Sequence, residues 1–167
     1  MPLEISEDVV SLAYQSLGYF VMEGQKVGGR EIDLLALRLG NDGAIQERLH
    51  VEVSISTRPI GVLRDKPGLA SGRDPVAAAE AFAKKKFHDP SVLKAVETAF
   101  KSKDYKRVFV HGRLSKKAEP QLCVLRAQGI ECTHVGKLVR EAQQGSMRNR
   151  LQRAVEIADL LLGSEDA

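Results

Sequence analysis

The feature that most restricts the fold of this chain is a pair of apolar segments joined by a tight turn. Residues 32–39 are nearly all apolar, and Asp33 interrupts them. Such a run predicts a strand that is buried on both faces. The Gly-Asn-Asp-Gly sequence at 40–43 predicts a turn. Residues 49–55 then alternate between apolar and polar side chains, which is typical of a strand. Together these segments predict an antiparallel hairpin.

The rest of the chain predicts a single α/β domain with a mixed central sheet flanked by helices. Apolar residues at helical spacing predict helices at 6–17, 76–87, 91–101, 119–128, 136–144 and 147–162. Other apolar segments predict strands at 19–22, 32–39, 49–55, 106–112 and 130–133. We expect the first three strands to be antiparallel and the last two to form a parallel crossover. Residues 1–145 would form the core of the domain, and residues 146–167 a C-terminal helix packed on the same domain.

Length and composition agree with one globular domain in the cytoplasm. The chain has 167 residues, of which 43% are hydrophobic, and both values are usual for a single domain. No apolar run approaches the roughly 20 residues that a membrane helix needs, so we expect no association with a membrane. The two cysteines are too few for a disulfide framework and lack partners at zinc-binding spacing. A cytoplasmic location is therefore the expectation.

The hairpin places two acidic residues opposite each other. If it is symmetric about Asp42 and Gly43, Asp33 lies across from Glu52 on the same face, whereas a slip of one residue would separate them. Adjacent carboxylates repel each other unless a cation lies between them. Because Mg²⁺ and Mn²⁺ prefer carboxylate oxygens and water, Asp33 and Glu52 are candidate metal ligands. Acidic side chains that reach the solvent at strand ends are the alternative.

The order of the elements and the segments REIDLLAL (30–37) and HVEVSIS (50–56) resemble the PD-(D/E)XK, or restriction-endonuclease-like, nucleases, which include Holliday-junction resolvases. The resemblance covers residues 6–144 and implies that fold, phosphodiester hydrolysis and a Mg²⁺ or Mn²⁺ cofactor. Asp33 matches the first metal-binding acid of the family, and Glu52 matches the acid of its ExK element. Glu7 matches an acid on the first helix that can approach the metal, although a favourable charge in the first helical turn is an equal explanation.

One position departs from the family pattern. Ser54 stands where the family usually has a lysine that is thought to orient the water and stabilise the transition state. A serine is neutral and only donates or accepts a hydrogen bond. Some members with another polar residue here remain active, so Ser54 joins Asp33 and Glu52 as a candidate catalytic residue. A basic group could also come from elsewhere, and the candidates in falling order are Arg30, Arg58 and the run Lys84, Lys85 and Lys86, each with an ordinary surface charge as the alternative.

Charge is distributed unevenly along the chain. Residues 1–57 carry 4 Lys/Arg and 9 Asp/Glu, whereas residues 84–117 carry 11 Lys/Arg and 3 Asp/Glu. A metal site beside a phosphate-binding surface would have this distribution, and so would a solvated charged helix and loop. Arg30, Arg58, Lys84, Lys85 and Lys86 are the candidate nucleic-acid-binding residues.

Two functions are consistent with these observations. The first is a metal-dependent nuclease that hydrolyses phosphodiester bonds in DNA or, as the less favoured substrate, RNA, with Mg²⁺ or Mn²⁺ as cofactor. The second, suggested by Ser54, is a catalytically inactive module of the nuclease fold that binds nucleic acid or a protein partner. A homodimer is a further assembly that the sequence allows.

Overall fold

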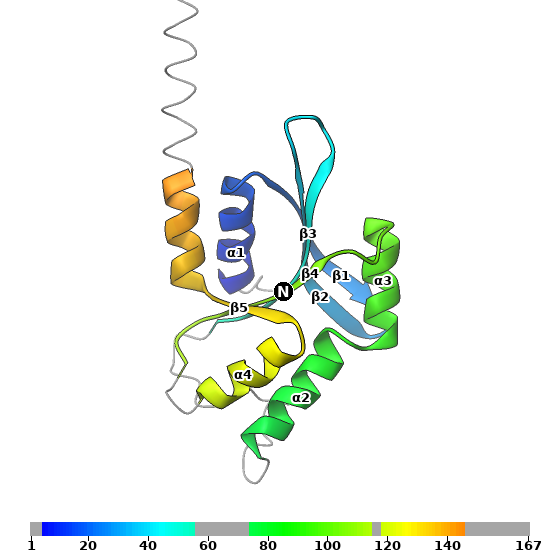
Figure 1. Ribbon diagram of the computed structural model, residues 1–167, viewed down its shortest axis with the longest axis vertical. Helices are drawn as coiled ribbons and strands as arrows, with labels where there is room; N and C mark the ends of the chain where they lie inside the picture. The colour runs from blue at the N-terminus through cyan, green and yellow to red at the C-terminus, as the bar shows by residue number, and fades with distance from the viewer. Residues whose placement is uncertain (1–4, 56–73, 115–117, 146–167) are drawn as a thin grey trace, which may run out of the picture.

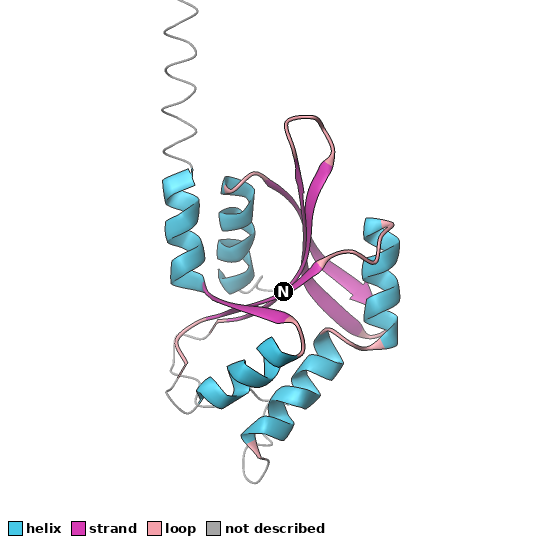
Figure 2. Ribbon diagram, in the orientation of Figure 1, coloured by secondary structure: helices cyan, strands magenta, loops and turns pink. Residues whose placement is uncertain are grey.

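The computed structural model describes residues 5–55, 74–114 and 118–145. In this part of the chain a five-stranded sheet has helices on both faces (Figures 1 and 2). The elements are α1 (Ile5–Ser16), β1 (Tyr19–Val27), β2 (Arg30–Leu39), β3 (Ile45–Ser54), α2 (Pro75–Lys86), α3 (Pro90–Phe100), β4 (Lys106–His111), α4 (Glu119–Ala127) and β5 (Ile130–His134). A further helix occupies residues 135–145.

The topology of the sheet agrees with the prediction from sequence. The strands lie in the order β1-β2-β3-β4-β5. The pairs β1–β2 and β2–β3 are antiparallel, and the pairs β3–β4 and β4–β5 are parallel. The predicted α/β class, with a mixed sheet flanked by helices, is therefore confirmed.

The strand boundaries differ from those predicted. Strand β1 continues to Val27, five residues beyond the predicted end, and turns into β2 through Gly28 and Gly29 alone. Both glycines have positive φ, 52° and 77°, as a two-residue hairpin turn requires. Strand β3 begins at Ile45 rather than at residue 49. Neither extension has the alternation of apolar side chains that marks a strand in the sequence. Backbone hydrogen bonds to β2 hold both extensions in the sheet instead.

Helices α2 and α3 begin with the same capping arrangement. Asp74 Oδ1 accepts a hydrogen bond from Val76 N at 3.2 Å, and Asp89 Oδ1 accepts one from Ser91 N at 3.0 Å. A proline follows each capping aspartate at the first helical position, where its missing N–H costs nothing. The Asp74 cap fixes the residue at which α2 starts. It therefore also helps to determine which residues at the C-terminal end of α2 reach the sheet.

The two faces of the sheet are covered by different helices. Helix α1 and residues 135–145 pack on one face, against side chains that include Leu34, Val51 and Val110. Helices α2 and α4 cover the other face around Phe87 and Phe109, and α3 covers the part of the sheet formed by β1 and β2 (Figure 1). Because successive strand residues alternate between faces, Val51 and Val53 point toward α1, whereas Glu52 points toward α2.

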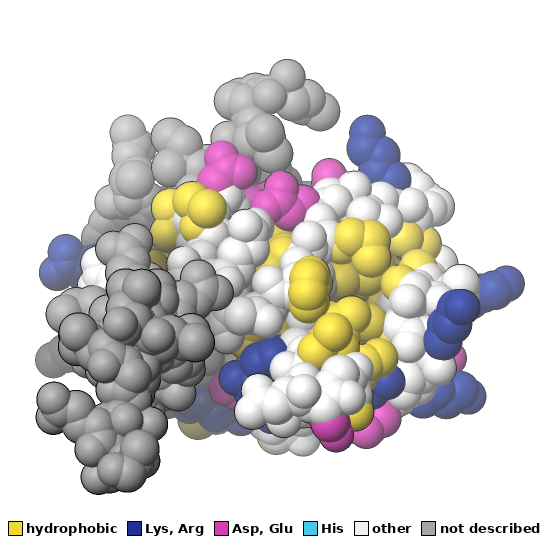
Figure 3. All heavy atoms as spheres, turned by 90° about the horizontal axis from the view of Figure 1, so that it is seen from above, with side chains coloured by type: hydrophobic (Ala, Val, Ile, Leu, Met, Phe, Trp, Pro, Cys, Tyr) yellow, Lys and Arg dark blue, Asp and Glu magenta, His cyan; other side chains and the backbone are white. Residues whose placement is uncertain are grey.

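Some large apolar side chains remain exposed. Phe20 and Met22 on the edge strand β1 are 65% and 48% exposed, and hydrophobic side chains gather on the face seen in Figure 3. Within the described ranges, no helix is both long and apolar enough to cross a membrane. The predicted helix at 147–162 and Arg58 lie outside the residues that the structure describes.

Candidate active site

Strands β2 and β3 place Asp33 and Glu52 side by side. Leu34 pairs with Val51, and the same register continues as far as Arg38 and Glu47. One further step in this register sets Asp33 opposite Glu52. Strand β3 also holds the Asp33 side chain, because Asp33 Oδ2 accepts a hydrogen bond from Val53 N at 2.8 Å. Asp33 is 8% exposed and Glu52 only 1%, so two carboxyl groups are buried next to each other.

The last residue of α2 brings a lysine to this acidic pair. Lys86 Nζ lies 2.6 Å from Glu52 Oε2 and 3.4 Å from Asp33 Oδ1. Phe87, the next residue, is fully buried against the sheet and so holds the end of α2 over β3. One ammonium group thus bridges both carboxyl groups, although it comes from a helix and not from the strand that carries Glu52.

The other oxygen of Glu52 contacts a buried histidine. His50 Nε2 lies 3.0 Å from Glu52 Oε1, and His50 is fully buried. The two residues are two positions apart on β3 and therefore share a face. The imidazole packs against the ring of Phe87, with 5.0 Å between ring centroids. Glu52 is consequently held from both sides, by His50 at one oxygen and by Lys86 at the other.

The electrostatics of the cluster reflect an excess of buried negative charge. Burial, and after it the neighbouring Glu52, raise the pKa of Asp33 to about 7, although Lys86 opposes the shift. Burial also raises the pKa of Glu52, against the effect of Lys86. Burial lowers the pKa of His50 to about 3, so its imidazole is neutral near pH 7. Two carboxyl groups therefore share the single positive charge of Lys86.

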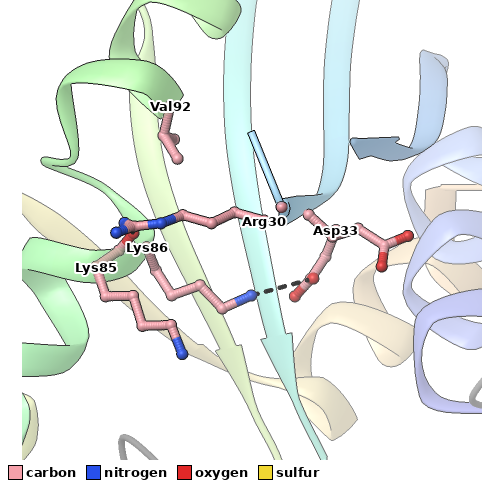
Figure 4. A pocket seen from close by; sticks show the side chains of 7 residues that line it. Arg30, Asp33, Lys85, Lys86 and Val92 are labelled. Atoms are coloured by element: carbon pink, nitrogen blue, oxygen red, sulfur yellow. Dashed lines mark hydrogen bonds and ion pairs between the residues drawn. The ribbon is translucent and has the colours of Figure 1, made fainter. Parts of the chain in front are cut away.

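A pocket opens beside the acidic pair. It has a volume of about 270 Å³ and is lined by Gly29, Arg30, Glu31, Asp33, Lys85, Lys86 and Val92. Figure 4 shows Lys86 reaching across to Asp33 while Arg30 extends toward the end of α2. Arg30 is held there by an ion pair with Asp89 at 2.5 Å and by a hydrogen bond to Lys85 O at 3.1 Å. Asp33, one member of the acidic pair, thus lines an opening that has basic side chains on its walls.

The residues present suit a hard divalent cation. Asp33 and Glu52 supply carboxylate oxygens, and the single positive charge of Lys86 does not balance two negative charges. The described residues hold no cluster of three or more His, Cys, Asp or Glu side chains arranged as metal ligands. Mg²⁺ often takes only one or two protein carboxylates and keeps several waters, so the pair alone is a sufficient protein contribution.

The structure does not gather all the predicted site residues around this pair. Glu7 is in the first turn of α1, and α1 packs on the face of the sheet opposite to the one that carries Glu52. Ser54 is half-buried at the end of β3, and its carbonyl accepts a hydrogen bond from Gly112 N at 3.2 Å. Lys84 is exposed on α2. The roles of Glu7 as a metal ligand and of Ser54 in catalysis stay predictions.

Sequence reasoning undervalued one residue of the cluster and missed another. The sequence places Lys86 among the least favoured candidates for the basic group, because only the fold shows that the end of α2 lies over β3. His50 was not proposed at all. A polar residue two positions before Glu52, on the same face of a buried strand, is the signal that points to it.

Comparisons with known proteins add no relative to this chain. No family model, curated protein or solved structure matches it.

Proposed function

We propose that this protein is a restriction-endonuclease-like, metal-dependent nuclease that hydrolyses phosphodiester bonds in DNA. The observation that carries the proposal is the position of Lys86. Its ammonium lies 2.6 Å from Glu52 and 3.4 Å from Asp33, so an Asp, a Glu and a Lys form one cluster without a lysine at position 54. The departure at Ser54 therefore does not remove the basic group from the site.

The residues of the cluster suit the demands of phosphodiester hydrolysis. Asp33 and Glu52 would hold Mg²⁺ or Mn²⁺, which supplies a Lewis acid for the phosphate group when bound. In the reaction, the oxygen of a water bonds to phosphorus and that water loses a proton, while the bond to the sugar oxygen breaks and this oxygen takes up a proton as it leaves. Negative charge builds up on the phosphate oxygens, and the Lys86 ammonium, fixed in advance beside the carboxylates, offsets it.

The surroundings of the cluster favour a polyanionic substrate. Arg30, Lys85 and Lys86 line the pocket beside Asp33, and Lys84 is exposed on the same turn of α2. Basic side chains of this kind contact phosphates and carry little sequence information. We therefore expect DNA binding that weakens steeply as the salt concentration rises.

A cleavage assay with a matched pair of lysine variants tests the proposal. Linear, supercoiled, branched and single-stranded DNA, and RNA, are incubated with the wild-type protein in Mg²⁺ or Mn²⁺ and in EDTA. We expect metal-dependent cleavage of DNA. Lys86→Met is expected to lower the rate by about 10²-fold, as loss of a fixed charge-stabilising group does, whereas Lys84→Met should change it less than about threefold.

The same assay separates the proposal from its alternative. Absence of cleavage on every substrate by folded wild-type protein would contradict the nuclease proposal. Salt-dependent binding of fluorescent DNA, measured by anisotropy in that case, would favour the inactive binding module suggested by Ser54. Equal loss of activity in Lys84→Met and Lys86→Met would assign the effect to general DNA binding and remove the special position of Lys86.

A further inference from the structure

The buried histidine of β3 has no role in the function proposed so far. His50 lies among apolar strand residues, Leu49 and Val51, and is fully buried. An apolar side chain at this position would avoid the cost of burying a polar ring. The cost is larger here because Nδ1 has no hydrogen-bond partner within the described residues. Packing alone therefore does not account for a histidine at this position.

The surroundings of the ring settle which nitrogen carries its proton. Nε2 lies 3.0 Å from the Glu52 carboxylate oxygen Oε1, whereas Nδ1 faces no acceptor in the described chain. A neutral imidazole has one N–H and one unprotonated nitrogen. The arrangement in which Nε2–H donates to Oε1 of Glu52 is the one that satisfies a buried carboxylate oxygen, and it leaves the proton on the ring nitrogen that has an acceptor.

We propose that His50 is a positioning residue, whose Nε2–H holds Oε1 of Glu52 so that Oε2 faces Lys86 and the metal site. Phe87 packs on the His50 ring at 5.0 Å between centroids, directly after Lys86 in the chain. The end of α2 thus makes two contacts with the cluster: Phe87 packs on His50, and Lys86 binds Glu52. This inference rests on the proposed metal-dependent function, and it assigns His50 to the orientation of a ligand and not to contact with the substrate.

Metal binding measured without substrate tests this role. Mn²⁺ is titrated into wild-type protein and into His50→Leu, His50→Gln and His134→Gln by calorimetry. Loss of an outer hydrogen-bond partner lowers metal affinity by roughly 10–100-fold, and we expect that loss in His50→Leu. His50→Gln keeps an N–H donor and should recover most of the affinity. His134→Gln, an exposed position on β5, should bind as the wild type does.

Three results would overturn the role of His50. Equal Mn²⁺ affinity in wild type and His50→Leu would remove it and leave the nuclease proposal standing. Absence of Mn²⁺ binding by the wild type would overturn both the nuclease proposal and this inference. A loss in His50→Leu that His50→Gln does not recover would assign the effect to packing and would also contradict the role.

A spectroscopic measurement on the wild type keeps the test independent of whether the variants fold. Nitrogen chemical shifts of ¹⁵N-labelled histidines report which ring nitrogen is protonated. We expect His50 to carry its proton on Nε2, with a shift of that resonance when Mg²⁺ is added. A proton on Nδ1, or no response of Nε2 to Mg²⁺ at saturation, would contradict the proposal.

Discussion

Strand β3 carries two glutamates, each paired with a lysine, in opposite electrostatic states. Glu47 lies on the face toward α1, where Lys106 Nζ is 2.5 Å and Arg38 3.2 Å from its carboxylate oxygens, and Tyr19 donates a hydrogen bond to it. Although burial works against ionisation, hydrogen bonds from Lys106 and Tyr19 lower the pKa of Glu47 below its usual value. Glu52 lies on the opposite face, and burial raises its pKa in spite of Lys86.

The difference lies in how much positive charge and solvent each carboxylate receives. Glu47 has two cations whose side chains are 60% and 41% exposed. Glu52 shares one cation with a second carboxylate, and its own side chain is 1% exposed. The first arrangement suits a surface ion-pair network. The second is costly for folding, and a buried cluster with shifted pKa values beside a pocket is a candidate for function.

The largest expected effect is on catalysis, and it separates the two glutamates. Under the proposed function, Glu52→Gln should lower the rate of DNA cleavage by about 10²–10³-fold, because it removes a charged ligand from the site. Glu47→Gln, the matched change on the other face, should leave the rate within about threefold of the wild type. Initial rates at saturating Mg²⁺ measure both, and a similar loss in the two variants would end the distinction.

The two lysines should differ in their contribution to stability. Lys86→Met leaves two buried carboxyl groups without a counter-charge, and we expect the free energy of unfolding to fall by about 3 kcal/mol. Lys106→Met removes an exposed partner of Glu47 and should cost less than about 1 kcal/mol. Urea denaturation at pH 7.5 in EDTA measures both values. Costs of equal size would show that burial does not separate the two clusters.

The raised pKa of Asp33 predicts an unusual pH dependence. Because the folded protein holds a proton on Asp33 up to about pH 7 and the unfolded chain loses it near pH 3.8, this group's contribution to stability falls as the pH rises between these values. Asp33→Asn should therefore be more stable than the wild type at pH 8, by about 2 kcal/mol, and the gain should shrink toward pH 4. Urea denaturation in EDTA across this pH range measures the difference in the free energy of unfolding, with the exposed Asp104→Asn as control. A difference between Asp33→Asn and wild type that does not change with pH would contradict the prediction.

The smallest expected effect is that of Glu47 on stability, and it has the opposite pH dependence. A lowered pKa means that Glu47 stabilises the folded state above its unfolded pKa of about 4.5, and that this contribution is lost as the pH falls through its lower folded value. Glu47→Gln should lower the free energy of unfolding at pH 7 by less than about 1 kcal/mol. The loss should diminish in about 1 M salt, where exposed charges are screened. A loss of stability that does not change with salt would show that the ion pairs of Glu47 behave like those of the buried Asp33, Glu52 and Lys86 cluster.

The sequence allowed the acidic pair to be predicted, although one premise of that prediction was wrong. The register of Leu34 with Val51 is the one expected from a symmetric hairpin. The hairpin itself is not symmetric, because Leu39 pairs with Ile45 and the register shifts between Arg38 and Leu39. The need to bury one face of each strand fixes the register near the site. The one-residue difference in register is taken up close to the turn, between Arg38 and Leu39.

The lysine and the histidine of the cluster depend on information that strand patterns do not contain. Lys86 reaches Glu52 because Phe87 anchors the end of α2 on the sheet, and a periodicity in the sequence does not indicate where a helix end will lie. His50 stands in the alternating segment that predicts β3, but its environment is set by Phe87 and Tyr105 from outside the strand. Both residues depend on tertiary packing of α2 and the segment before β4.

The register shift between Arg38 and Leu39 also determines where the chain tolerates a change in length. This shift takes up a one-residue difference in length between the two strands next to the turn. The number of residues in the segment 40–44 can therefore change without moving Asp33 relative to Glu52. A single insertion within 34–38 would instead turn one carboxylate to the opposite face. The tip of the β2–β3 hairpin is thus the place to graft an epitope or a fluorescent reporter, since the graft would leave the acidic pair aligned.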